Sequence, residues 1–134
     1  MTNLLLILLL LVGCVIGMIV NISIIGFGYF LFSIDIIPVP DGLFPYPQNN
    51  LHLFKFYHFI FPFLAHSIGT FVSVYFVCRY ATNYKFILSL IISSFFLLGL
   101  LTSTKLAPNS YLIFDAVFAY FPMAYIAWKL NSND

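Results

Sequence analysis

Four long runs of apolar residues constrain this chain more than any other feature. Each run has the length of a membrane-spanning helix, which needs about 20 mostly apolar residues. The runs cover residues about 4–30, 57–77, 86–101 and 111–128. Backbone groups in lipid must be hydrogen-bonded within their own segment, and the runs lack the alternation of transmembrane strands. The sequence therefore predicts an all-α polytopic membrane protein, a single transmembrane domain of four helices over residues 1–134.

The scarcity of charge supports this prediction. Only 7% of the residues are charged, while 63% are apolar, and the chain has five Lys or Arg and four Asp or Glu. A water-soluble surface of this size needs many more charges, which argues against a soluble fold and a disordered chain. A net charge of +1 without a basic patch also argues against a nucleic-acid partner. The expected surroundings are the lipid bilayer.

The start of the chain resembles a lipoprotein processing site at Leu11–Cys14. Two features favour an uncleaved first helix instead. No positive residue stands at Met1–Asn3, and the chain stays apolar from Cys14 through Val20, where a processed protein would turn polar.

The distribution of Lys and Arg predicts the orientation. The two termini and the 79–85 loop share one side of the membrane with Arg79, Lys85 and Lys129, whereas the other side has Lys55 and Lys105. Positive residues favour the cytoplasmic side, so we expect both termini in the cytoplasm.

A proline-rich outer loop is predicted between the first and second helices, at about residues 31–56. Its four prolines forbid a helix, and its apolar residues are unusual for a solvated linker. The prolines are Pro38, Pro40, Pro45 and Pro47. We expect the loop to lie on the membrane interface and cap the bundle, or alternatively to form a lid over a pocket.

Small and polar residues mark a packing face on the first helix, at Gly13, Gly17, Asn21 and Gly28. Such residues let helix backbones approach closely in lipid. The partner is either another helix of this chain or a second copy, and the sequence leaves both alternatives open.

Two prolines fall inside predicted helices, Pro62 in the second and Pro122 in the fourth. Each removes a backbone hydrogen bond and predicts a kink. Such a kink is either a static bend or a hinge used in transport or gating.

His66 and Asp115 are the two ionisable residues within the apolar runs. The second and fourth helices run in the same direction, and the two residues lie at similar depths, so a hydrogen bond between them is geometrically available. Thr70 and Ser73 share the face of His66 and complete the candidate intramembrane site. The pair is interpreted first as a clamp between helices. A proton or ion relay and a ligand or catalytic site are the alternatives, because ionisable residues in a membrane are functional candidates.

Metal and cofactor sites are not expected. His52, His58 and His66 are six and eight residues apart, and neither spacing places two ligands on one helix face. Gly-rich phosphate loops, nucleophile elbows and Cys-x-x-Cys motifs are not found in the sequence.

Two motifs carry a resemblance to a known group of proteins. Residues 58–70 read HFxxPFxAHxxGT, residues 115–124 read DxxxAYxPMA, and the preceding loop contains Ile37–Gly42. Over residues about 35–128 the chain resembles small uncharacterised bacterial membrane proteins with four helices. The resemblance implies an integral protein of the bacterial inner membrane, and no activity.

The leading functional expectation is a non-enzymatic accessory or structural membrane component. Other membrane subunits, or a second copy bound through the first helix, would be its partners. One alternative is a small transporter or channel component that uses His66 and Asp115. The other is a membrane-embedded enzyme acting on a lipid or a quinone.

Overall fold

The structure is a computed structural model that describes residues 3–33, 59–102 and 108–132. Its elements are α1 (Asn3–Ser33), α2 (Ile60–Tyr80), α3 (Lys85–Thr102), α4 (Asn109–Asp115), η4 (Ala116–Tyr120) and α5 (Phe121–Leu130). The last three join end to end as one helix, in which η4 is a single π-turn. The described part of the chain is all-helical, and four of its helices are long and apolar enough to cross a membrane.

The helices extend beyond their predicted ends. The first continues to Ser33, so residues 31–33 are helical and not part of the predicted outer loop; the rest of that loop lies outside the described residues. The second begins at Ile60 and ends at Tyr80, three residues beyond the predicted end. Its last turn includes Arg79. The third helix (Lys85–Thr102) and the fourth (Asn109–Leu130) are likewise slightly longer than predicted.

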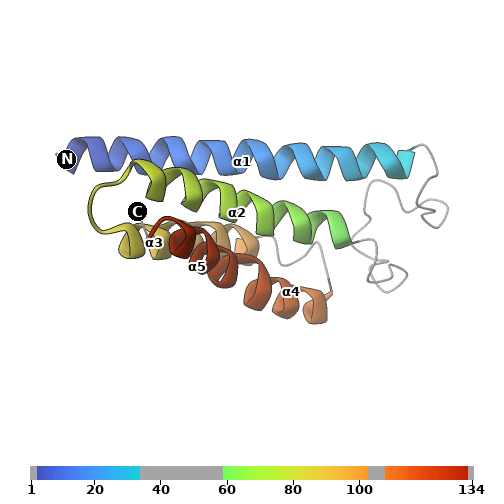
Figure 1. Ribbon diagram of the computed structural model, residues 1–134. Helices are drawn as coiled ribbons and strands as arrows, with labels where there is room; N and C mark the ends of the chain where they lie inside the picture. Colours follow the sequence, from blue (N-terminus) through green and yellow to red (C-terminus); the bar gives the residue numbers. More distant parts are fainter. Residues whose placement is uncertain (1–2, 34–58, 103–107, 133–134) are drawn as a thin grey trace.

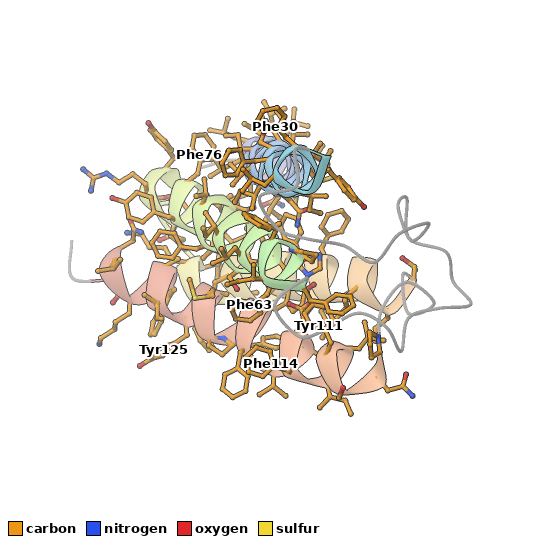
Figure 2. The ribbon with its side chains drawn as sticks, turned by 90° about the vertical axis from the view of Figure 1, so that its right-hand side faces the viewer. Phe30, Phe63, Phe76, Tyr111, Phe114 and Tyr125 are labelled. Carbon is orange, nitrogen blue, oxygen red and sulfur yellow. The ribbon has the colours of Figure 1, made fainter. Side chains whose placement is uncertain are left out.

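α2 is the central helix of the arrangement. α1 packs on one side of α2 and has little contact with α3, whereas α3 and the α4–η4–α5 helix pack together on the other side (Figure 1). The view along the helices in Figure 2 shows the same layering, with α2 between α1 and the other two helices. Both chain termini lie at one end of the molecule, as an even number of helices that alternate in direction requires.

The α1–α2 interface is built on glycine. A Cβ atom added at Gly13 would lie 2.3 Å from Val77 Cγ2, and one at Gly17 would lie 2.8 Å from the carbonyl oxygen of Gly69. Ser73 Oγ donates a 2.8 Å hydrogen bond to the carbonyl oxygen of Gly13. Bare backbone at the glycines therefore brings α1 close enough for a side chain of α2 to bond its main chain.

The remaining predicted packing residues also face α2. A Cβ at Gly28 would lie 2.6 Å from Phe61 Cγ, and the Cβ of Asn21 lies against Gly69. Within the described residues, the small-residue face of α1 is thus used inside the chain.

The core lies where α2, α3 and α5 meet. Val74, Val77 and Ile92 are fully buried there beside small residues of the last helix, Ala124 and Ala127. At the end with the termini, Lys85 Nζ donates a 2.9 Å hydrogen bond to the carbonyl oxygen of Asn131, linking the start of α3 to the end of α5. At the opposite end, aromatic contacts join α2 to α4, with ring centroids 5.1 Å apart for Phe63 and Phe114 (Figure 2).

Candidate functional site

Asp115 is a fully buried carboxyl group within the fourth long apolar helix. It is the last residue of α4, six residues from the start of that helix, and its side chain has 0% exposure. At 1.5 Å per residue it lies about 9 Å along the helix. A carboxyl group buried this completely needs a partner, because an uncompensated charge in apolar surroundings is strongly unfavourable.

His66 of α2 provides that partner. Its Nδ1 lies 2.5 Å from Asp115 Oδ2, so the hydrogen bond expected from the helix directions and depths is formed. The imidazole is 21% exposed. A buried carboxylate holding a partly exposed imidazole fixes which ring nitrogen faces outward, and this arrangement recurs in proton-transfer and ligand-binding sites.

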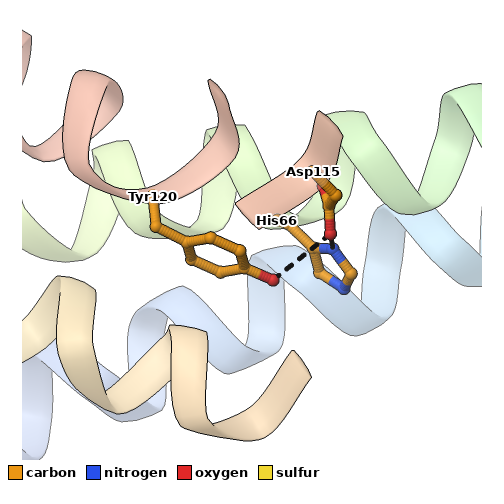
Figure 3. A network of polar contacts seen from close by, with 3 residues as sticks. All are labelled: His66, Asp115 and Tyr120. Carbon is orange, nitrogen blue, oxygen red and sulfur yellow. Dashed lines mark hydrogen bonds and ion pairs between the residues drawn. The ribbon is translucent and has the colours of Figure 1, made fainter. Parts of the chain in front are cut away.

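Tyr120 joins the pair, and the sequence analysis did not select it. Its hydroxyl donates to Asp115 Oδ2 over 3.4 Å, and its ring stacks on that of His66 with centroids 5.7 Å apart. Both polar contacts converge on the same carboxylate oxygen (Figure 3). The cluster therefore consists of His66, Asp115 and Tyr120.

The π-turn is what brings Tyr120 to Asp115. In an α-helix, residues five apart point about 140° away from each other. A π-turn closes its hydrogen bonds from residue i to i+5, so residues five apart lie nearly one above the other. Residues Ala116–Tyr120 adopt this conformation, immediately after Asp115.

The two prolines occupy different positions. Pro122 is the second residue of α5 and directly follows the π-turn. Since proline lacks the backbone N–H that an α-helix would use at this point, a locally wider turn accommodates it. Pro62 is the third residue of α2, in the first turn, where N–H groups have no partner within the helix. Pro62 therefore interrupts no hydrogen bond of α2, unlike the interior kink that the sequence predicts.

Thr70 and Ser73 are both buried, but their hydroxyl groups differ in their hydrogen bonding. Ser73 bonds α1 through the carbonyl of Gly13, so it belongs to the helix interface. Thr70 is fully buried, and its hydroxyl has no hydrogen-bond partner among the described residues. Neither residue lines the cavity at His66.

A cavity of about 600 Å³ lies between α1 and α3, where these two helices are not in close contact. His66 and Tyr120 form part of its wall. Most of the remaining lining is apolar and comes from Met18, Ile22 and Ile25 of α1 and from Phe95, Phe96, Leu98, Gly99 and Leu100 of α3; Asn21 and Thr102 add polar groups. Asn21, expected only as a packing residue, thus also faces a cavity.

The cavity is open at its edge. Ile22 on α1 and Leu98 on α3 both line it, yet they are 70% and 62% exposed. Its size is typical of pockets that hold small molecules, which range over roughly 300–1,000 Å³. The cluster therefore combines a buried carboxylate, an oriented imidazole and an apolar space that the imidazole reaches.

Metal ligation finds no support in the described residues. They contain no group of three or more His, Cys, Asp or Glu side chains close enough to hold a metal ion. His52 and His58, considered with His66 from the sequence, lie outside the described residues.

Comparisons with family models, with characterised proteins and with solved structures find no match for this chain. The resemblance to small bacterial membrane proteins stays a prediction.

Proposed function

We propose that this protein is a small integral membrane protein that binds a lipid-soluble molecule between α1 and α3, against His66 and Tyr120. The supporting observation is the apolar cavity that reaches the imidazole of a buried His–Asp pair. Because Ile22 and Leu98 are exposed on the outer surface of the helices, the molecule would enter sideways from the bilayer.

The character of the lining favours a lipid-soluble ligand over an ion. None of the lining side chains is Lys, Arg, Asp or Glu, and most are aliphatic or aromatic. Ion pathways through membranes are instead lined by polar or charged groups that replace the hydration shell. Of the alternatives from the sequence, the membrane-embedded enzyme acting on a lipid or quinone shares this ligand class, whereas the transporter or channel component finds less support in the lining.

A photolabelling experiment tests the proposal with a matched pair of glycine variants. A Cβ added at Gly99 or at Gly26 meets no atom within 4 Å, but only Gly99 lines the cavity. The full-length protein, reconstituted in lipid nanodiscs, is labelled with methyl palmitate carrying a mid-chain diazirine, and labelled peptides are mapped by mass spectrometry.

We expect labelling of the cavity-lining parts of α1 and α3, reduced several-fold by Gly99→Leu and unchanged by Gly26→Leu. Labelling that is spread evenly over all lipid-facing helices, and equal in both variants, would refute binding in the cavity.

The proposal includes the orientation expected from the sequence, with both termini in the cytoplasm of a bacterial cell and the protein in its inner membrane. The end with the termini also has Arg79, Lys85 and Lys129, which supports this direction. A fluorescent protein fused to the C-terminus should fold and fluoresce, whereas a periplasmic phosphatase reporter at the same position should be inactive.

The role of accessory or structural component stays a prediction beside this one. Since the small-residue face of α1 packs on α2, a partner subunit or a second copy would have to use the opposite face of α1, which carries Leu8, Val15 and Ile22. Co-purification from native membranes at a fixed ratio would support such an assembly, and isolation as a monomer would argue against it.

A further inference from the structure

We infer that the molecule bound in the cavity is uncharged and presents a carbonyl oxygen to Nε2–H of His66, as a quinone or an acyl ester does. This inference rests on the proposed function, because it specifies the ligand of the same cavity. Three features of the site support it: the contact of Nδ1 with Asp115, the proton on Nε2 and the absence of charge in the lining.

The first feature follows from the carboxylate. Asp115 Oδ2 accepts from the hydroxyl of Tyr120 and faces Nδ1 of His66 at 2.5 Å. Two such atoms 2.5 Å apart hold a single proton between them, whether it belongs to the carboxyl or to the imidazole. Nδ1 is therefore occupied by Asp115 and is not free to bind a ligand.

The second feature follows from the charge balance. Asp115 is fully buried, and its only ion-pair partner among the described residues is His66. An isolated carboxylate in apolar surroundings is far less stable than a carboxylate whose charge is neutralised. Arg79, Lys85 and Lys129 cannot neutralise it, because they lie at the end of the molecule with the termini. A His66–Asp115 pair without net charge has one proton between Oδ2 and Nδ1 and a second on Nε2, whichever residue the first proton belongs to.

The third feature concerns what Nε2–H meets. Figure 3 shows the second ring nitrogen on the side of the imidazole away from Asp115, and within the described residues it has no hydrogen-bond partner. His66 lines the cavity, so this donor is available to a ligand there. The His66–Asp115 pair is neutral overall and the lining has no Lys or Arg, so a phosphate or carboxylate would bring an uncompensated charge into an apolar space. An uncharged carbonyl satisfies the donor without that penalty.

Competition against the diazirine-bearing methyl palmitate label tests this inference. The competitors are decylbenzoquinone and methyl laurate, each with a counterpart that lacks the carbonyl: decylbenzene and dodecane. A well-formed hydrogen bond to a buried donor is worth enough to change affinity about tenfold. We expect at least one carbonyl competitor to displace the label at about tenfold lower concentration than its hydrocarbon counterpart, and the stronger of the two identifies the ligand class.

A double variant links the preference to the histidine. His66→Phe with Asp115→Leu removes the donor and the carboxylate together, so no unpaired charge remains buried. This variant should still be labelled but should show no preference for the carbonyl competitors. The comparison in the unaltered protein does not depend on the folding of any variant.

The outcomes separate the two proposals. If carbonyl and hydrocarbon competitors displace the label equally, while labelling still depends on Gly99, the cavity binds lipid-soluble molecules but the assignment of a carbonyl is wrong. If labelling does not depend on Gly99, the proposed function itself fails.

Discussion

The two faces of α2 contact their neighbouring helices in opposite ways. Towards α1, the contact consists of glycines and a single hydroxyl-to-backbone hydrogen bond, from Ser73 to Gly13. Towards α4 and η4, it includes an ion pair and a tyrosine hydroxyl within a span. Both are polar contacts between buried helices, but the second costs far more to bury.

The difference supports the proposal that the second contact has a purpose beyond adhesion. Small residues give close helix packing without burying a charge, as the α1–α2 interface demonstrates. A buried carboxylate is unnecessary for that purpose, and here its partner lines a cavity while Ser73 does not. Four substitutions test this contrast.

The largest effect should come from separating the ion pair. His66→Leu leaves Asp115 buried without its partner, and removing one member of a buried pair costs about 3–5 kcal/mol. We expect the free energy of unfolding in detergent to fall by about that amount. The double variant His66→Leu with Asp115→Leu should recover most of the loss. A double variant as unstable as the single one would show that the loss comes from packing and not from the charge.

The next effect should come from the glycine face. A Cβ at Gly17 would lie 2.8 Å from the backbone oxygen of Gly69, which cannot yield as a flexible side chain can. Gly17→Ala should therefore destabilise the protein by about 1–3 kcal/mol, the usual cost of overpacking. Gly26→Ala is the matched control on the same helix, because its added Cβ meets no atom within 4 Å. Equal stability of the two variants, measured by thermal unfolding, would mean that α1 does not pack on α2 as described.

A smaller effect is expected at Ser73. Its hydroxyl is fully buried and bonds the carbonyl of Gly13, and such bonds between membrane helices average about 0.6 kcal/mol. Ser73→Ala should lower stability by roughly this amount and leave photolabelling of the cavity unchanged. A loss of labelling at unchanged stability would instead place Ser73 in the ligand site, as the sequence analysis had it.

The sequence was sufficient to predict the four long apolar helices and the contact between His66 and Asp115. Apolar length alone determines which segments can cross a bilayer, and parallel helix directions bring residues at equal depth within reach. The spacing of the glycines also predicted the packing face of α1. It did not predict whether the partner helix belongs to the same chain or to a second copy, because bare backbone packs equally well on any helix.

The cavity and Tyr120 could not be predicted in the same way. A cavity depends on how far α1 and α3 stand apart, which no local pattern encodes. Tyr120 was missed because regular helical spacing places it away from Asp115, and only the π-turn reverses this. Pro122, two residues later, was the available signal, since it shows that regular α-helical bonding cannot continue.

The smallest effect on stability should come from Tyr120. Its hydroxyl reaches Asp115 over 3.4 Å, longer than the usual 2.5–3.0 Å of a hydroxyl donor, so the bond is weak. Tyr120→Phe keeps the ring that stacks on His66 and should lower the free energy of unfolding by only a few tenths of a kcal/mol, below the roughly 0.5–1.5 kcal/mol of a well-formed bond. Tyr125→Phe, at an exposed position of α5, is the control. A loss above about 1.5 kcal/mol would be larger than a well-formed neutral bond provides. Tyr120 would then hold the helices together as His66 and Asp115 do. The polar contact on this face of α2 would consist of three stabilising residues instead of two.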